Sequence, residues 1–301
     1  MPIKTAIDKA LPSFVHYGVD ESAGNNIVVS LTSFPERLPG LHYCLYSLLT
    51  QSIKPEKLIL WLGREQFSGL EADLPASILD LRKNGLEIRW TSDIKQYKKI
   101  IPALTSYPDK LIVTADDDIY YRPNWLELLY QDYLDNNKAP MVYAHRVHKI
   151  KLLPDGLPLP YLLWQHCQGY HPEPSYYNFP TTGGGNLYPP GTLHEDVLNE
   201  SRFQELAPFA DDLYIWAMAV LKGTKTKIVQ DNHRAIIDLF PEMTTLQSSH
   251  FTLAKINCVM GKNDEQLLNI LNYYPDILMK LVIERKVLQK NRPQPCRTQA
   301  I

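Results

Sequence analysis

Residues 111–120 read Leu-Ile-Val-Thr-Ala-Asp-Asp-Asp-Ile-Tyr, an apolar run of strand length that ends in the three carboxylates of Asp116, Asp117 and Asp118. The Leu-Ile-Val run is typical of a strand that is buried on both faces of a parallel sheet. Adjacent acids repel one another, and a divalent cation or a positively charged ligand relieves that repulsion. Because ligands of open α/β sheets bind at the carboxyl ends of the strands, the triplet predicts a metal and phosphate site. The alternative is a solvated acidic turn after an edge strand.

The composition is that of an ordinary globular protein. The chain has 301 residues, of which 45% are hydrophobic and 21% are charged, and its formal net charge is −2. This balance argues against disorder and against a nucleic-acid partner, which would call for a strongly basic face. The four cysteines are far apart, which favours reduced thiols. We find no signal peptide at the start and no run of 18 apolar residues, so we expect a cytoplasmic protein.

Strand and helix patterns alternate along the first half of the chain. The predicted strands are residues 27–31, 58–62, 86–90, 111–114 and 141–145. The predicted helices between them are residues 38–49, 77–83, 98–106 and 124–136. Strands separated by helices imply a parallel sheet with right-handed crossovers. We therefore predict an α/β protein whose mostly parallel sheet is flanked by helices.

The second half of the chain has a different texture. Residues 152–190 are rich in proline and aromatic residues, which indicates a long irregular excursion that builds a substrate pocket. Helical spacing returns at 211–221, a strand is predicted at 226–229, and residues 264–290 form one or two closing helices. We divide the chain into a lead segment, residues 1–26, one domain, residues 27–250, and a C-terminal helical extension and tail, residues 251–301.

Polar and basic residues follow several of the predicted strands. Thr32, Ser33 and Arg37 come after the first strand, and Ser92, Asp93, Lys98 and Lys99 come after the third. The carboxyl ends of parallel strands lie at one edge of a sheet, so these residues converge with the acid triplet. Hydroxyls, an arginine, a lysine and a lone carboxylate together suit a nucleotide diphosphate. Taken singly, each is also typical of a loop start or a solvated helix face.

Several stretches resemble a known family. The order Val-Val-Ser-Leu-Thr-Ser-Phe-Pro-Glu-Arg at 28–37, Leu-Leu-Thr-Gln-Ser at 48–52, Pro-Glu-Lys-Leu-Ile-Leu at 55–60 and then the acid triplet resembles the GT-A nucleotide-sugar glycosyltransferases, near their family 2 branch. The resemblance covers about residues 27 to 220. It implies a GT-A, Rossmann-like sheet. The chain departs from the pattern at 61–64, where Trp-Leu-Gly-Arg replaces an acidic turn, so Asp93 is the better candidate for base recognition.

Shorter motifs narrow the resemblance to bacterial enzymes of capsule or lipopolysaccharide sugar transfer. These motifs are residues 97–104, 107–109, 116–121, 187–190 and 211–212. The resemblance implies a sugar transferred from a nucleotide diphosphate donor, with UDP as the expected nucleotide, to a saccharide or lipid-linked saccharide hydroxyl during surface polysaccharide assembly.

The resemblance also implies a metal and a set of donor contacts. Mn²⁺ or Mg²⁺ is held by Asp116 and Asp118, and His250 supplies a late metal or diphosphate contact. Hard oxygen ligands suit either cation. The expected nucleotide and donor contacts are Thr32, Ser33, Arg37, Asp93, Lys98, Asp116, Asp117, Gly184 and Gly185. The two glycines allow backbone amides to approach the donor, although a loop without function fits them almost equally well.

An inverting transfer needs a base for the acceptor hydroxyl. Asp211 and Asp212 stand directly before the predicted helix at 213–221, where a carboxylate near the sugar fills that role. An aspartate at a helix start also serves as an ordinary N-cap. With two acids present, one can serve as the N-cap while the other acts as the base. The resemblance favours Asp212 as the base, followed by Asp211.

Two further features leave alternatives open. The aromatic residues of the excursion suit stacking on sugar rings or packing in the core; they are Tyr161, Trp164, Tyr170, Tyr176 and Tyr177. The tail from Leu281 is basic, which favours peripheral contact with anionic lipid at the inner face of the membrane, or a solvated helix end.

Rival functions are a retaining transferase, a nucleotidyltransferase of sugar phosphates and a non-catalytic carbohydrate-binding protein. The nucleotidyltransferase normally has a Gly-rich basic loop after the first strand, which this chain lacks.

Overall fold

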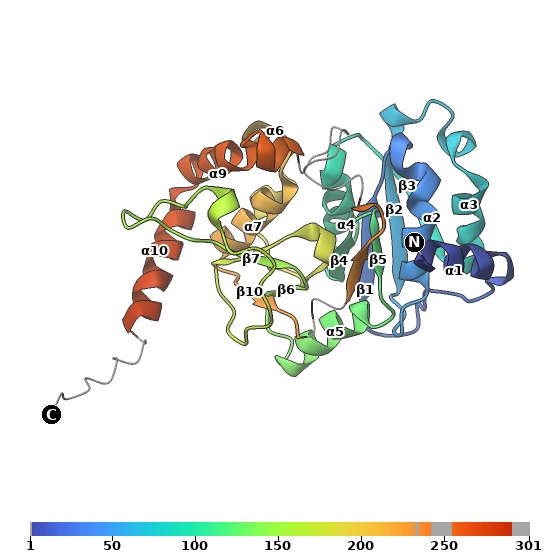
Figure 1. Ribbon diagram of the computed structural model, residues 1–301, viewed down its shortest axis with the longest axis horizontal. Helices are drawn as coiled ribbons and strands as arrows, with labels where there is room; N and C mark the ends of the chain where they lie inside the picture. Colours follow the sequence, from blue (N-terminus) through green and yellow to red (C-terminus); the bar gives the residue numbers. More distant parts are fainter. Residues whose placement is uncertain (1, 231, 233–234, 242–254, 291–301) are drawn as a thin grey trace.

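The computed structural model describes residues 2–230, 232, 235–241 and 255–290. A central sheet has helices on both sides (Figure 1). The strands are β1 (Ile27–Thr32), β2 (Lys57–Gly63), β3 (Leu86–Thr91), β4 (Leu111–Ala115), β5 (Ile119–Tyr121), β6 (Val142–Ala144), β7 (Val147–Lys149), β8 (Asn178–Pro180), β9 (Asn186–Tyr188), β10 (Thr226–Ile228) and β11 (Ile236–Asp238). The helices are α1 (Pro2–Ala10), α2 (Leu38–Leu49), α3 (Ala76–Leu79), α4 (Ile101–Ser106), α5 (Trp125–Asp135), α6 (Glu200–Leu206), α7 (Asp211–Lys222), α9 (Lys262–Tyr273) and α10 (Pro275–Lys290).

The central sheet is mostly parallel. Its seven strands lie in the order β10-β6-β9-β4-β1-β2-β3. Strands β4, β1, β2 and β3 pair in parallel, as do β10 and β6. Strand β9 lies between β4 and β6 and is antiparallel to both. Since β4 and β6 are antiparallel to the same strand, they point the same way, and their carboxyl ends share one edge of the sheet.

The predicted α/β architecture is confirmed, and all six predicted strands form. Strand β9 was not predicted, because its three residues, Asn186 to Tyr188, lie in the excursion that we expected to be irregular throughout. Two predicted helices are broken. Residues 77–83 divide between α3 and a 3₁₀ turn, Asp80–Asn84, and residues 98–106 divide between a 3₁₀ turn, Lys95–Lys99, and α4.

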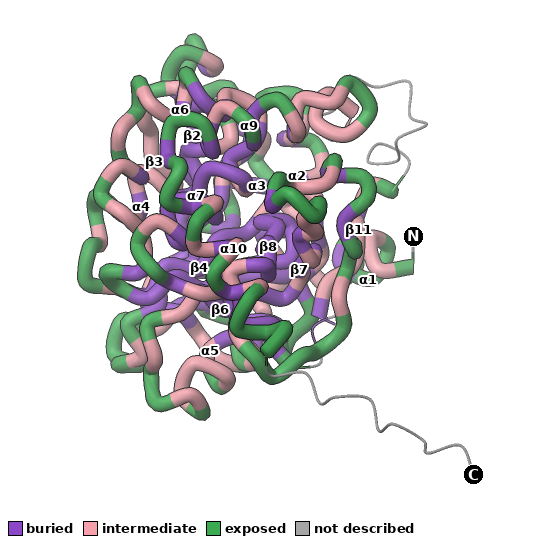
Figure 2. The backbone as a smooth tube through the Cα atoms, turned by 90° about the vertical axis from the view of Figure 1, so that its left-hand side faces the viewer, coloured by how far each residue is buried: buried purple, intermediate pink, exposed green. Residues whose placement is uncertain are grey.

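The core has two halves, one on each face of the sheet. Alternate residues of β1 point to opposite faces, so Val28 joins one half while Ile27 and Val29 join the other. Helices α4, α6, α7, α9 and α10 contribute to the half that contains Val28, which we call the first half of the core. Helices α2, α3 and α5 cover the other face, with Ile27 and Val29. Figure 2 shows buried residues concentrated along β4, β6, β8 and α7. The closing helices α9 and α10 therefore belong to the same core as the sheet.

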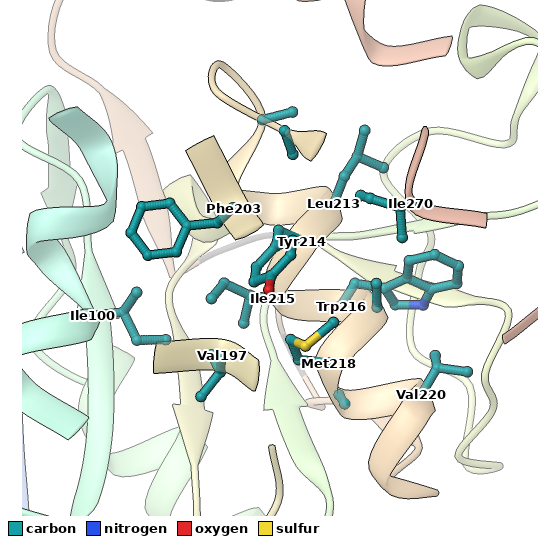
Figure 3. Packing of buried hydrophobic residues seen from close by; sticks show 14 of the residues in the cluster. Ile100, Val197, Phe203, Leu213, Tyr214, Ile215, Trp216, Met218, Val220 and Ile270 are labelled. Atoms are coloured by element: carbon teal, nitrogen blue, oxygen red, sulfur yellow. The ribbon is translucent and has the colours of Figure 1, made fainter. Parts of the chain in front are cut away.

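Helix α7 is the most deeply buried helix segment of the first half of the core. Residues Leu213 to Val220 are all buried, and Figure 3 shows Tyr214, Trp216 and Met218 packed among residues of neighbouring elements. The helix ends at Gly223, whose φ of +92° is a left-handed C-cap that glycine adopts at little cost. A helix apolar on nearly every side is held in one position, so the side chains at its first turn are fixed as well.

Three of the five aromatic residues that we considered in the excursion pack in the core. Tyr161, Trp164 and Tyr177 are buried in the core beside Phe179, which is the packing role. Tyr176 is partly buried against the same cluster, and Tyr170 is 47% exposed.

A tight turn leads into β9 and places it in the sheet. Gly185 has a φ of +90° and a ψ of +129°, a backbone conformation that is essentially restricted to glycine. A Cβ at this position would lie 2.3 Å from the ring of Trp125. The indole Nε1 of Trp125 also donates to the carbonyl of Gly184, at 2.9 Å. Helix α5 and the turn therefore fit together only with glycine at this position.

Two small sheets flank the acid triplet and the excursion. Strand β5 pairs with β11 and β7 pairs with β8, both antiparallel. Among the helices of the described ranges, none is both long enough and apolar enough to cross a membrane.

Candidate active site

The acid triplet lies at the carboxyl end of β4, beside the residues that follow β1. Ser33 Oγ donates to Asp117 Oδ2 at 2.6 Å, and Arg37 Nη1 lies 2.9 Å from Asp118 Oδ2 and 3.6 Å from Asp117 Oδ1. The predicted convergence of the first and fourth strand ends is therefore present. The side chains of Asp116, Asp117 and Asp118 keep 28%, 12% and 17% of their surface exposed. They are accessible to a ligand.

Lys99 connects the triplet to the start of α7. Its Nζ lies 2.8 Å from Asp116 Oδ1, 3.0 Å from Asp211 Oδ2 and 2.6 Å from Thr182 Oγ1. The ammonium group donates hydrogen bonds to Asp116 and Thr182 and forms an ion pair with Asp211, although its side chain is only 6% exposed. The carbonyl of Lys99 also accepts from Ser30 Oγ at 2.6 Å, which ties the lysine to the middle of β1. One buried cation thus connects three separate chain segments.

The two aspartates of α7 have different environments. Asp211 is buried and paired with Lys99, whereas Asp212 is partly exposed and Asp212 Oδ1 accepts from the backbone N–H of Thr182 at 3.2 Å. Burial and, after it, the negative charge of Asp211 raise the pKa of Asp212 to about 7. Asp212 has no ion pair within the described part of the chain. It therefore exchanges a proton near neutral pH, as a general base must.

The charges of the triplet are unequally compensated. Burial opposes ionisation of Asp116, but the charge and hydrogen bond of Lys99 hold its pKa below the ordinary value. Burial and then the charge of Asp118 raise the pKa of Asp117 to about 7, and burial and then Asp116 raise the pKa of Asp118. The positive charge of Arg37 lowers the pKa of both Asp117 and Asp118, but both values stay above the ordinary one. The triplet therefore attracts additional positive charge.

Asp93 and Lys98 form a separate pair at the ends of β2 and β3. Lys98 Nζ bonds Asp93 Oδ1 and also donates to Gln66 Oε1 at 3.2 Å. Lys98 and Lys99 are both buried, so neither belongs to a solvated helix face. Within residues 2–230, no contact of this pair reaches the triplet. Strands β3 and β4 are consecutive in the sequence, but β1 and β2 lie between them in the sheet.

The other predicted site residues have local partners. Thr32 Oγ1 donates to the carbonyl of Trp61 at 2.8 Å. The amides of Gly184 and Gly185 donate to the carbonyls of Thr181 and Thr182, at 3.3 and 2.8 Å. Both glycine amides thus close the turn, and the observed reason for glycine here is close packing. His250 lies outside the described residues.

The carboxylate oxygens of the acid triplet suit a hard divalent cation. Carboxylate oxygens are the ligands that Mg²⁺ and Mn²⁺ prefer. The pKa values of Asp117 and Asp118 stay raised although Arg37, Lys99 and Arg146 lie near the triplet, so its negative charge is not fully offset. Across the parts of the chain that the structure describes, no three His, Cys, Asp or Glu side chains form a ready ligand set. Magnesium is commonly bound by one or two carboxylates together with substrate phosphates, and Asp116 and Asp118 fit that arrangement.

Two site residues escaped the sequence analysis. Thr182 was not predicted, because a threonine before three glycines carries no distinctive signal. Lys99 was expected at the ligand edge with Lys98, but nothing in the sequence shows that it joins Asp116 to Asp211. Arg146 was also missed, although it follows the predicted strand at 141–145. The rule that selected Arg37 and Asp93, namely that residues just after a strand line the ligand edge, selects Arg146 as well.

The comparisons with known proteins found similar structures but no sequence relatives. No family model matches the chain, and no curated protein matches it. A crystal structure of S. aureus TarS, residues 1–349, has 16% identity and a TM-score of 0.46, covering 82% of this chain and 72% of that chain. The same TarS fragment with UDP-GlcNAc has 16% identity and a TM-score of 0.43, covering 70% of this chain and 57% of that chain. The TarS fragment with UDP has 18% identity and a TM-score of 0.43, covering 82% of this chain and 70% of that chain.

Replacing Lys99 by methionine is expected to destabilise the fold strongly. The Lys99→Met variant leaves the carboxylates of Asp116 and Asp211 without their cation, and breaking a buried ion pair from one side costs about 3 kcal/mol or more. Chemical denaturation at pH 7 measures the loss. The double variant Lys99→Met/Asp211→Asn removes the most buried uncompensated charge and is expected to recover part of the stability. An unchanged denaturation midpoint for Lys99→Met would contradict this role.

Proposed function

We propose that the chain is a GT-A-type glycosyltransferase. It transfers a sugar from a nucleotide diphosphate donor, a UDP-sugar, to a saccharide hydroxyl with inversion at the anomeric carbon. The acceptor is a precursor of a bacterial surface polysaccharide such as capsule or lipopolysaccharide, as the sequence resemblance implies. The proposal depends mainly on one observation: Lys99 links the acid triplet to the start of α7, where the pKa of Asp212 is raised to about 7.

Lys99 is the residue that carries this observation. Its contacts to Asp116 and Asp211 hold the end of β4 against the start of α7. Asp212 follows Asp211 and presents a partly exposed carboxylate from the same helical turn. A donor held at the triplet therefore has a base beside it. A carbohydrate-binding protein needs no such combination, since aromatic surfaces alone suffice to hold a sugar.

The residues divide the chemistry between them. The acceptor oxygen attacks the anomeric carbon, the bond from that carbon to the diphosphate oxygen breaks, and Asp212 takes the acceptor proton. Arg37, with its fixed fork of N–H donors, suits the oxygens of the departing diphosphate. Asp116 and Asp118 would hold a divalent cation, which would supply further neutralisation of the leaving group. The Asp93–Lys98 pair lies on the side of the sheet where we place the nucleoside.

A nucleotide screen tests the donor class. We expect UDP or its sugar conjugates to raise the melting temperature with Mn²⁺ present, whereas GDP and CMP do not. Saturation at about 100 times Kd contributes about 2.7 kcal/mol, or roughly 4 °C for a chain of this size. In the Asp118→Ala variant, the part of this rise in melting temperature that depends on Mn²⁺ is expected to be lost.

Asp109→Ala serves as the matched control for that screen. Asp109 is exposed and precedes β4, so it lies at the opposite edge of the sheet from the triplet. Its variant is expected to bind the nucleotide as the unmodified protein does. If no nucleotide stabilises the protein under any metal condition, the transferase proposal is wrong and carbohydrate binding becomes the better explanation.

Asp212→Asn is expected to lower kcat by about 10²- to 10⁴-fold, the usual contribution of a general base. In the unmodified protein kcat rises with pH and levels off above about 7, because the carboxylate of Asp212 must lose its proton to act as the base. Turnover is followed as UDP release, with saccharides or water as acceptor.

Nucleotide affinity and melting temperature are the controls for Asp212→Asn. Both are expected to change little, since this carboxylate has no ion pair in the described ranges. Asp211→Asn lowers the melting temperature more, because Asp211 is paired with Lys99. A variant Asp212→Asn that retains most of its activity would favour a retaining transfer, which needs no such base.

We also propose that α10 binds anionic lipid at the inner face of the membrane, where a lipid-linked acceptor is presented. Met279, Ile283 and Val287 follow one another at four-residue spacing and are 53%, 53% and 51% exposed. Lys286 and Lys290 are exposed on the same face, while the opposite face is buried in the core. An apolar stripe bordered by lysines suits an anionic membrane surface. Arg292 and Arg297 of the basic tail lie outside the described residues.

Vesicle binding tests this surface. The protein is expected to sediment with vesicles that contain phosphatidylglycerol and not with neutral phosphatidylcholine, and added salt is expected to weaken the binding. Each of Lys286→Glu and Lys290→Glu weakens it by about fivefold or more. Leu268→Ser, an exposed apolar position on α9, is the matched control. Equal binding to neutral vesicles, or dimerisation that Ile283→Ser abolishes, would show that the stripe serves another purpose.

A further inference from the structure

Arg146 is held in one orientation beside the candidate active site. It follows β6, and its Nε donates to Thr181 Oγ1 at 2.6 Å. The backbone N–H of Thr181 donates to the carbonyl of Arg146 at 2.9 Å. Because Thr181 bonds both the backbone carbonyl and the Nε of Arg146, the guanidinium has less freedom to lose when it binds a ligand.

The turn after Thr181 is shaped around this arginine. A Cβ at Gly183 would lie 2.3 Å from Arg146 Nη2, and a Cβ at Gly184 would lie 2.5 Å from Arg146 Cβ. The same Cβ at Gly183 would lie 3.0 Å from Asp116 Oδ2. Arg146 Nη2 and the outer oxygen of Asp116 therefore border the same small space over Gly183, which only glycine leaves open.

The end of the guanidinium has no partner in the part of the chain that the structure describes. Arg37 is within ion-pair distance of Asp117 and Asp118, and Lys99 is paired with Asp116 and Asp211. Arg146 has no ion pair among these residues, and its two terminal nitrogens have no hydrogen-bond acceptor there. It thus has paired N–H donors available in the geometry that recognises a carboxylate or a phosphate.

The sheet places Arg146 on the acceptor side of the triplet. Strand β6 is two strands from β4, about 10 Å away, on the side opposite β1, β2 and β3. The Asp93–Lys98 pair, where we place the nucleoside, is on the other side of β4. Thr182, next to the Thr181 that holds Arg146, donates its N–H to the candidate base Asp212. A group bound by Arg146 therefore belongs to the transferred sugar or the acceptor.

We propose that Arg146 binds an anionic group, a carboxylate or a phosphate, carried by the transferred sugar or by the acceptor. The inference rests on the proposed function, since it names the chemical class of the substrate at that site. A neutral saccharide offers only hydroxyls, which need no fixed cation to be bound. The guanidinium is half-buried, and the nearby Asp116 is already paired with Lys99, so a bound anion would give Arg146 a counter-charge of its own.

Two pairs of probes test the proposal by calorimetry. In the donor arm, UDP-glucuronate is compared with UDP-glucose, both with Mn²⁺. In the acceptor arm, glucose 6-phosphate is compared with glucose, with and without UDP. We expect the unmodified protein to prefer the anionic member of one pair by about tenfold to a hundredfold, the usual effect of a charged hydrogen-bonded pair. The arm that shows the preference identifies which substrate carries the anion.

Arg146→Gln is expected to abolish this preference, and Arg146→Lys to keep part of it. UDP affinity is expected to stay within about threefold in both variants, and melting temperatures confirm that each is folded. Arg82→Gln is the matched control, because Arg82 is exposed, pairs with Glu71 and precedes β3 at the opposite edge of the sheet.

Two results would overturn the inference. One is equal affinity for the anionic and neutral members of both pairs, and the other is a loss of UDP affinity in Arg146→Gln as large as the loss for the anionic probes. The second result would assign Arg146 to the leaving diphosphate. If the unmodified protein binds no nucleotide, the proposed function fails by itself, and the acceptor arm without UDP still shows whether Arg146 selects an anion.

Discussion

The buried ammonium group of Lys99 is the interaction on which the candidate site depends. It is enclosed by acceptors from β4, from the turn before β9 and from α7. A lysine buried without partners would cost several kcal/mol, so these segments are stable together only while each supplies its oxygen atom. The acids at the end of β4 and at the start of α7 repel one another, and the shared cation changes that repulsion into an attachment. The geometry of the site follows from this one charge.

The antiparallel strand β9 is the second constraint. It enters the sheet between two strands that point the opposite way, and the turn before it therefore reaches the edge where the acids lie. That turn supplies Thr182 to Lys99 and holds Arg146 through Thr181. Glycines are needed there because Trp125 and Arg146 occupy the space of their side chains. A three-residue strand thus completes both the sheet and the site.

Neighbouring residues of the same type have different roles because of where they point. Asp211 is buried against a cation, while Asp212, one position along the helix, is partly exposed and titrates near neutral pH. Lys98 and Lys99 likewise bond to acids on different sides of β1 and β2. In each pair the backbone turns the adjacent side chains apart, so burial and neighbouring charge decide which residue supports the structure and which meets a ligand.

The sequence alone determined the parallel strands, the flanking helices and the acid triplet with its partners after β1. Those features depend on local periodicity and on the rule that strand ends share an edge, both of which a single sequence displays. Only the tertiary structure decided the position of β9, the connection through Lys99 and the free guanidinium of Arg146. These depend on contacts between residues 17 to 112 positions apart, such as Lys99 with Asp116 and Asp211. No local pattern specifies which distant acceptor a buried cation will meet, because that choice is made by packing of the whole core.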